Sequence, residues 1–123
     1  MQIKNPSDTI PFNKGIASKK QEHVGIIMLD CGHNVITKKD LFIGGTSRSL
    51  VDTKIVFWEL CRKNASAFIV YHNHPCGNES PSSEDITMTK CLQNAGEILG
   101  IQLLDHVIVT KYSYKSFRES NLI

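Results

Sequence analysis

The residues with the clearest capacity for chemistry are two histidines close together and an acidic residue that follows them. His72 and His74 end an apolar run, and Asp85 lies three positions after Ser82. At the end of a strand, residues i and i+2 point to the same side, so both imidazoles can aim at one point. Asp85 falls in the first turn of an expected helix, which the intervening loop can fold back over the histidines. Two imidazoles and one carboxylate predict a zinc ion that keeps a fourth position for water, the pattern of catalytic zinc.

Each of these residues also has an ordinary structural interpretation. The pattern Ser82-x-x-Asp85 is typical of any helix N-terminus, because serine caps the first turn and an acid suits the positive end of the helix dipole. A single histidine is more often packed or exposed than bound to a metal. The combination of two histidines at strand spacing and an acid on the next helix turn is much less common by chance, so the metal site and the structural interpretation both stay open at this point. Other metal motifs do not match: Cys76 has no partner for a deaminase-type Pro-Cys-x-x-Cys, and there is no His-Glu-x-x-His.

A site that activates water also needs a base to accept the proton. Glu22 opens the first expected strand and could project from a sheet end near the histidines. Glu79 and Glu84 are closer in sequence but belong to the loop and the helix start, where a solvated role or a helix-dipole role is common. Glu59 and Glu97 lie in the middle of expected helices, where we expect them to be exposed. The residues alone do not choose firmly among these glutamates.

The first half of the chain predicts a β-hairpin followed by a helix. Two runs rich in β-branched residues, His23–Asp30 and Val35–Ile43, flank the turn Cys31–Asn34. Gly44-Gly45-Thr46-Ser47 breaks the pattern. A helix is expected from a cap at Asp52 or Thr53 to about Asn64. Its buried stripe is expected to be Val56, Phe57, Leu60 and Cys61.

The second half predicts alternating strands and helices. Ala67–Tyr71 reads as a buried strand that leads into a loop over 72–77. A helix starts after Ser82 or Ser83 and ends before Gly100, with a stripe of Met88, Cys91, Leu92, Ala95, Ile98 and Leu99. Ile101–Thr110 is a strand, 111–114 is a turn, and a short strand and a terminal helix over Phe117–Leu122 complete the chain. This order predicts a mixed α/β sheet with flanking helices.

Length and composition restrict the class of protein. The chain has 123 residues, of which 41% are hydrophobic and 21% charged, as in ordinary globular domains. We expect one domain over residues 1–123, with an irregular arm over 1–14 that has room for a short helix or strand. No apolar run approaches the roughly 20 residues of a membrane span, and no signal peptide is visible, so we expect a cytoplasmic protein without a membrane partner.

Charge and cysteine spacing exclude further classes. The formal net charge is +2, from 14 basic and 12 acidic residues, which does not favour a nucleic-acid surface and does not exclude one. The four cysteines form no Cys-x-x-Cys pair, which excludes a zinc ribbon or a thioredoxin-type site.

Three motifs together resemble one known family. They are His72-Asn73-His74-Pro75-x-Gly77, Pro81-Ser82-x-Glu84-Asp85 and Leu104-Asp105-His106-Val107-Ile108-Val109, with support from Glu22-His23, Leu29-Asp30 and Leu41-Phe42-x-Gly44. Over about residues 15–123 the chain resembles the RadC family, a bacterial branch of the JAMM/MPN metallopeptidase-like superfamily. The resemblance implies a three-layer, cytidine-deaminase-like α/β architecture.

The resemblance also implies roles for individual residues. It implies zinc (Zn2+) held by His72, His74 and Asp85, with Glu22 as the general base. It gives Ser82 the role of steadying the oxyanion as water attacks a carbonyl. Enzymes of the superfamily hydrolyse peptide or isopeptide bonds, so a peptide or protein substrate is expected, and relatives often form homodimers.

The sequence departs from the family pattern at a few positions. Longer members carry an N-terminal helix-hairpin-helix segment, so we expect either a short member or a chain that starts at an internal boundary. Cys76 stands where serine is usual, and Thr53-Lys54 replaces a usual Pro-Arg. We expect His106 to hold a neighbouring loop or ligand rather than to bind metal itself. A competing hypothesis is a DNA-associated module, as the family's DNA-repair label suggests, with a structural or vestigial metal site.

Overall fold

The computed structural model describes residues 1–44 and 51–123. Gly45, Thr46 and Ser47 of the expected break therefore lie outside the described residues. Within those two ranges, no helix is both long and apolar enough to cross a lipid bilayer.

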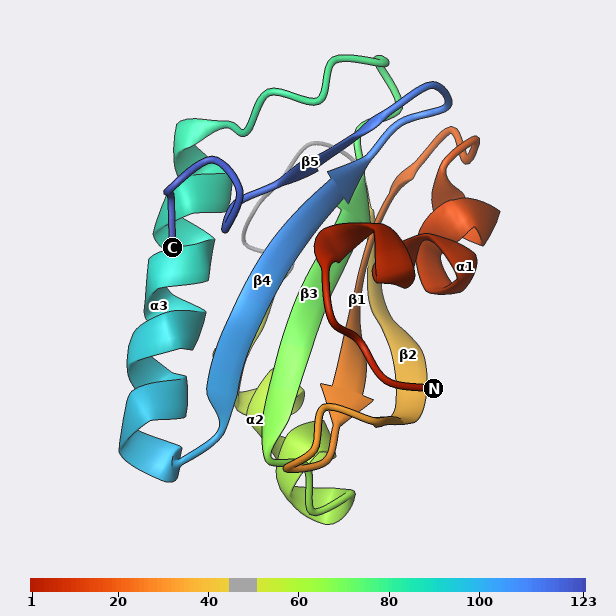
Figure 1. The fold of residues 1–123 in the computed structure, drawn as a ribbon. Helices are drawn as coiled ribbons and strands as arrows, with labels where there is room; N and C mark the ends of the chain where they lie inside the picture. The colour runs from red at the N-terminus through yellow and green to blue at the C-terminus, as the bar shows by residue number, and fades with distance from the viewer. Residues whose placement is uncertain (45–50) are drawn as a thin grey trace.

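The centre of the fold is a mixed sheet with the strand order β2-β1-β3-β4-β5 (Figure 1). The strands are β1 (Glu22–Leu29), β2 (Val35–Gly44), β3 (Ala67–Asn73), β4 (Gln102–Val109) and β5 (Tyr114–Ser116). β3 and β4 run parallel, whereas the other neighbouring pairs are antiparallel. The mixed α/β class and the expected hairpin of β1 and β2 are confirmed.

Helices cover one face of the sheet and the N-terminal segment covers the other. α2 (Thr53–Arg62) and α3 (Ser83–Leu99) pack on the first face, where Phe57, Leu60 and Leu92 join the strand residues in one apolar cluster. The N-terminal segment consists of η1 (Pro6–Thr9), α1 (Ile10–Asn13) and η2 (Lys14–Ile16), and its Ile3 and Ile16 join the cluster on the opposite face. The arm that we expected to be irregular is thus largely made of short helical turns, and the fold has three layers.

β3 is the best-buried strand, since every one of its residues is buried. It extends beyond the expected end at Tyr71, so the prediction that the loop begins at His72 is wrong. The reason is that β3 has a partner on both sides: His72 pairs with Val24 on β1 and with Ile108 on β4. Backbone pairing on both edges prolongs the strand past its apolar run.

α2 begins as expected but buries a different set of side chains. The Asp52 carboxylate accepts a hydrogen bond from Lys54 N at 2.9 Å and caps the helix. Cys61 is exposed, so its expected place in the buried stripe is wrong.

Glu59, which we expected to be exposed, has a side chain that is only 2% exposed. Its burial is possible because Lys39 on β2 and Arg62 both form ion pairs with its carboxylate. Glu59 therefore ties α2 to the edge strand β2.

α3 contacts the sheet through a narrower stripe than its apolar pattern predicted. The buried positions are Asp85, Thr89, Leu92 and Gly96, which recur at steps of three or four residues. Met88 and Ala95 are partly buried against the core, whereas Cys91, Ile98 and Leu99, which belong to the same apolar stripe, are exposed. The face of the helix that points to the sheet therefore begins with two polar residues.

The C-terminal residues after β5 form turns, so the helix expected over Phe117–Leu122 is wrong. The segment is anchored to β4, since Arg118 N donates to Asp105 Oδ1 at 3.0 Å and Phe117 N donates to the His106 carbonyl at 2.9 Å. It does not continue as a helix because Asn121 has a positive φ of 60° and Leu122 N donates to the Phe117 carbonyl, five residues back instead of four.

Gly96 fixes how closely α3 approaches the turn into β4. A Cβ at this position would lie well inside van der Waals contact with the backbone carbonyl oxygen of Ile101, whereas a Cβ at Gly15 would meet nothing within 4 Å. We expect Gly96→Ala to lower the free energy of unfolding by about 1–3 kcal/mol, because rigid backbone must move. Urea denaturation measures this change. The control Gly15→Ala should stay within about 0.5 kcal/mol of the wild type, and equal stability of the two variants would contradict the packing argument.

Candidate metal centre

The candidate site lies where β1 begins, β3 ends and α3 begins (Figure 1). His72 is fully buried in β3, and His74 follows one residue after the strand ends. The backbone of His74 is held by its N–H, which donates to the Val109 carbonyl at 3.0 Å. The Nε2 atoms of His72 and His74 lie 2.9 Å apart. Strand alternation thus brings both imidazoles to the same side, as their spacing predicted.

Asp85 reaches the histidines from the first turn of α3. Its Oδ2 lies 3.1 Å from His74 Nε2, and its Oδ1 lies 3.4 Å from His72 Nε2. Ser82 caps the helix: its hydroxyl accepts from Asp85 N, and its own N–H donates to Asp85 Oδ2, each at 3.0 Å. The same carboxylate therefore closes a capping box and faces both imidazoles.

Glu22 enters from the first position of β1. Its Oε1 lies 3.5 Å from His72 Nε2, and its side chain is 29% exposed. The antiparallel register pairs Val24 with His72, so Glu22 lies two positions further toward the open end of the sheet. Among the glutamates considered as a base, Glu22 is the one that joins the histidine cluster. Glu79 instead bonds to the Ser113 hydroxyl in the neighbouring hairpin.

Asn73 links the strand of the histidines to the segment that carries Glu22. Asn73 is fully buried and lies on β3 between the two histidines. Its side-chain oxygen accepts from His23 N at 2.6 Å, and its side-chain nitrogen donates to the carbonyls of Gln21 at 3.0 Å and Lys19 at 3.3 Å. These three bonds fix the backbone on both sides of Glu22. Sequence reasoning missed this role, because the amino-acid sequence does not show which backbone segment the side-chain amide of a buried asparagine will contact.

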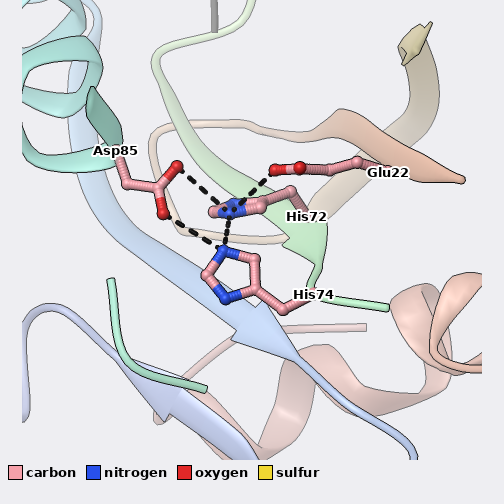
Figure 2. Close-up of side chains that lie close together, drawn as sticks. All are labelled: Glu22, His72, His74 and Asp85. Atoms are coloured by element: carbon pink, nitrogen blue, oxygen red, sulfur yellow. Dashed lines mark hydrogen bonds and ion pairs between the residues drawn. The ribbon is translucent and has the colours of Figure 1, made fainter. Parts of the chain in front are cut away.

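Together, the four side chains form a group that could hold a metal ion (Figure 2). Glu22, His72, His74 and Asp85 each offer one nitrogen or oxygen atom, and these atoms all lie within 4.8 Å of one another. They come from two strands, one loop and one helix. The structure thus brings together the three residues predicted as ligands and the glutamate predicted as base, and it places Ser82 at the helix cap beside them.

Electrostatics couple Asp85 to His74. Burial raises the pKa of the Asp85 carboxyl, but the neighbouring imidazoles of His72 and His74 and the Ser82 N–H outweigh burial and hold that pKa well below its ordinary value. Burial lowers the pKa of His74, but hydrogen bonds with Asp85 and the Asn78 carbonyl outweigh burial, so the pKa is raised. The carboxylate and the imidazole therefore each favour the charged form of the other.

Behind His72 lies a buried histidine that does not face the cluster. His106 is fully buried on β4, its Nε2 lies 2.6 Å from His72 Nδ1, and its ring stacks on Phe117. Burial lowers the pKa of His106 well below its ordinary value and so favours the neutral ring. Its other nitrogen lies 2.6 Å from the Thr89 hydroxyl on α3. Sequence reasoning missed Thr89, although its position one turn after Asp85 was a usable signal.

Comparison with known proteins identifies the family. A family model described as the RadC-like JAB domain matches residues 3–122. The chain belongs to the RadC family. It is 44% identical over 122 residues to a UPF0758 protein of Clostridium novyi, which covers 98% of the chain and 54% of that relative. It is 49% identical over 100 residues to one of Thermotoga maritima, covering 81% of the chain and 45% of the relative.

A third relative, a UPF0758 protein of Listeria welshimeri, is 44% identical over 118 residues, covering 95% of the chain and 53% of the relative. The chain therefore spans about half the length of these RadC relatives. The residues matched by the family model, 3–122, include all four side chains of the group that could hold a metal ion.

The coupling of His74 and Asp85 predicts a pH-dependent stability of the metal-free protein. Because the pKa of Asp85 is lowered in the folded protein, Asp85 stabilises the fold at pH values above its ordinary pKa of about 3.8. This stabilisation is lost as the pH falls from there toward the pKa of the folded state. Because the pKa of His74 is raised in the folded protein, His74 stabilises the fold at pH values below its ordinary pKa of about 6.5. This stabilisation is lost as the pH rises through the pKa of the folded state. In the presence of a chelator, the wild type should therefore have a higher Tm than Asp85→Asn, and the difference in Tm should be largest between about pH 4 and pH 6.5. Thermal unfolding against pH measures it, and a gap that stays constant to alkaline pH would refute the coupling.

Proposed function

We propose that this domain binds one zinc ion through His72, His74 and Asp85 and hydrolyses amide bonds of peptides or proteins, with Glu22 as the general base. The observation that carries the proposal is the convergence of four electron-donating groups within 4.8 Å on one side of the sheet. The RadC family membership and the resemblance to JAMM/MPN enzymes support an amide, in a peptide or isopeptide bond, as the bond that is cleaved.

The spacing of the three proposed ligands suits a tetrahedral ion. Ligands about 2.0–2.1 Å from a tetrahedral zinc ion stand about 3.3–3.4 Å from one another. The Nε2 atoms of His72 and His74 are 2.9 Å apart, and each has one oxygen of the Asp85 carboxylate nearby: Oδ2 lies 3.1 Å from His74 Nε2, and Oδ1 lies 3.4 Å from His72 Nε2. Two imidazoles and one carboxylate are also the donor set of hydrolytic zinc sites, which keep one position for water. The residues present therefore fit the group that the family implies.

The exposed fractions of the side chains support different roles for the proposed ligands and the proposed base. The side chains of His72 and Asp85 are 0% and 9% exposed, whereas that of Glu22 is 29% exposed. The groups proposed to hold the ion are thus the better-buried ones. The group proposed to move a proton faces solvent, from which water and substrate arrive.

When bound, a zinc ion lowers the pKa of a coordinated water to about 7 and polarises a substrate carbonyl. Glu22 then takes one proton from the attacking water as the water oxygen bonds to the carbonyl carbon. The carbon–nitrogen bond breaks next, and Glu22 delivers the same proton to the leaving amine. The Ser82 hydroxyl accepts from Asp85 N and keeps its own proton, so it can donate to the carbonyl oxygen as that oxygen becomes negative.

Metal content is the first test of the proposal. Purified wild type should hold about one zinc ion per chain, and His72→Ala, His74→Ala and Asp85→Ala should each lose it because only three protein ligands are available. Elemental analysis after gel filtration measures the ratio. His33→Asn is a matched control, because His33 lies in a turn at positive φ, which asparagine tolerates. A wild type without bound zinc would overturn the metal centre.

Turnover tests the role of Glu22 separately. Glu22→Gln should keep the zinc but lower kcat on a cleaved peptide by about 10²–10⁴-fold, because the amide cannot accept the proton. A peptide-library screen with zinc-loaded wild type identifies the substrate for this comparison. If Glu22→Gln cleaves at the wild-type rate, Glu22 is not the base.

Ser82 needs a test that separates its cap from its chemistry. Glycine replaces serine at a helix N-cap at a cost of only a few tenths of a kcal/mol, whereas threonine keeps a hydroxyl. We expect Ser82→Gly to keep its zinc and most of its stability but to lose about 10²–10³-fold in kcat, as expected for one missing oxyanion donor. Ser82→Thr should retain most of the rate. Equal rates for the two variants would leave Ser82 with a structural role only.

A further inference from the structure

A chain of buried hydrogen bonds runs from His72 back to the helix that carries Asp85. His72 Nδ1 lies 2.6 Å from His106 Nε2, and His106 Nδ1 lies 2.6 Å from the Thr89 hydroxyl. That hydroxyl donates to the backbone carbonyl of Asp85 at 2.8 Å. His72 and His106 are 0% exposed and Thr89 is 2% exposed, so the partners of these groups are one another. The chain thus starts at one proposed ligand and ends on the backbone of another.

We infer that His106 and Thr89 are positioning residues that set the tautomer of His72, so that its Nε2 lone pair faces the other donor atoms of the cluster. A neutral imidazole carries one proton, which stands on Nδ1 or on Nε2. Only the tautomer with the proton on Nδ1 leaves Nε2 free to bind a cation. The inference rests on the proposed metal centre and adds how that centre is prepared before an ion arrives.

The direction of the chain follows from its last contact. Two oxygens 2.8 Å apart need a proton between them, and the Asp85 carbonyl has none, so the Thr89 hydroxyl must supply it. Thr89 then has only lone pairs left for His106 and accepts from His106 Nδ1–H. With its proton on Nδ1, neutral His106 offers a lone pair at Nε2, which accepts from His72 Nδ1–H. Each donor finds one acceptor.

The opposite direction leaves a contact unsatisfied. If Thr89 donated to His106 Nδ1, its oxygen would face the Asp85 carbonyl oxygen at 2.8 Å with no proton between them. His106 would then donate to His72 Nδ1, and His72 would point an N–H into the cluster. In buried surroundings an unsatisfied polar contact is unfavourable, because no water replaces the missing hydrogen bond, and this favours the first direction.

Ring orientation is fixed as well as proton placement. The His106 ring stacks on Phe117 with centroids 4.3 Å apart and an angle of 21° between the planes. The His106 carbonyl accepts from Phe117 N at 2.9 Å. His106 therefore cannot turn away without disrupting the C-terminal turn. A metal-binding histidine more often donates to a carboxylate or a backbone carbonyl, whereas here the acceptor is a second imidazole oriented by threonine.

The test uses Thr89→Val, which keeps the shape of the side chain but removes the hydroxyl, and Thr89→Ser as the control that keeps it. Nitrogen-15 NMR of the metal-free proteins at about pH 8, where unperturbed histidine is neutral, shows which ring nitrogen carries the proton. In wild type and Thr89→Ser, His72 and His106 should each carry it on Nδ1. In Thr89→Val, this preference should be lost.

Zinc affinity, measured by competition with a chelator, is the second measurement. We expect Thr89→Val to bind zinc about 10–100-fold more weakly than Thr89→Ser, the usual effect of losing a residue that orients a metal ligand. A proton on Nε2 of His106 in wild type, or equal zinc affinity of the two variants, would overturn the inference. Failure of the wild type to bind zinc would overturn the proposed function alone, because the NMR measurement uses metal-free protein and still decides the tautomers.

Discussion

Four electron-donating groups face one another favourably at close range only when a proton or a metal cation stands between them. The Nε2 atoms of His72 and His74 are 2.9 Å apart, and carboxylate oxygens lie 3.1–3.5 Å from them. Lone pairs at these separations repel, and burial of His72 removes the water that would screen them. A proton between these atoms would relieve part of this repulsion, and a divalent cation would relieve more of it. The remainder of the fold can be understood as the framework that holds these groups together.

Helix capping and the proposed metal binding use the same carboxylate, that of Asp85. Asp85 closes a capping box with Ser82, which fixes its first helical turn, and the same oxygen that accepts from Ser82 N also faces His74. Because the cap already orders Asp85, little side-chain entropy remains to be lost when a cation binds. The geometry of this motif therefore accommodates both the helix cap and the proposed metal ligand, and neither excludes the other.

Local patterns predicted the elements of the site, whereas its long-range contacts needed the structure. Strand alternation predicts that His72 and His74 share a side, and the cap predicts that Asp85 opens a helix. Glu22 is distant in sequence from the histidines and could be chosen as the base only through a family resemblance. The sequence of neither strand alone determines the register of β1 against β3, which brings Glu22 to the site. Periodicity also assigned Ile98 and Leu99 to the apolar stripe of α3, although both are exposed. An apolar stripe shows which face of a helix is apolar, but not how far the neighbouring sheet extends beneath it.

Side chains alternate between the two faces of β3, which gives Asn73, the last residue of the strand, a part in the site beside His72 and His74. His72 points to the α3 face, so Asn73 must point to the opposite face, where the segment before β1 passes. There its amide holds the backbone at Lys19, Gln21 and His23. One strand therefore sets the proposed ligands with one face and the approach of Glu22 with the other. A shift of β1 against β3 would break both sets of contacts at once, so the distance between the ligands and the proposed base is fixed by the same pairing that forms the sheet.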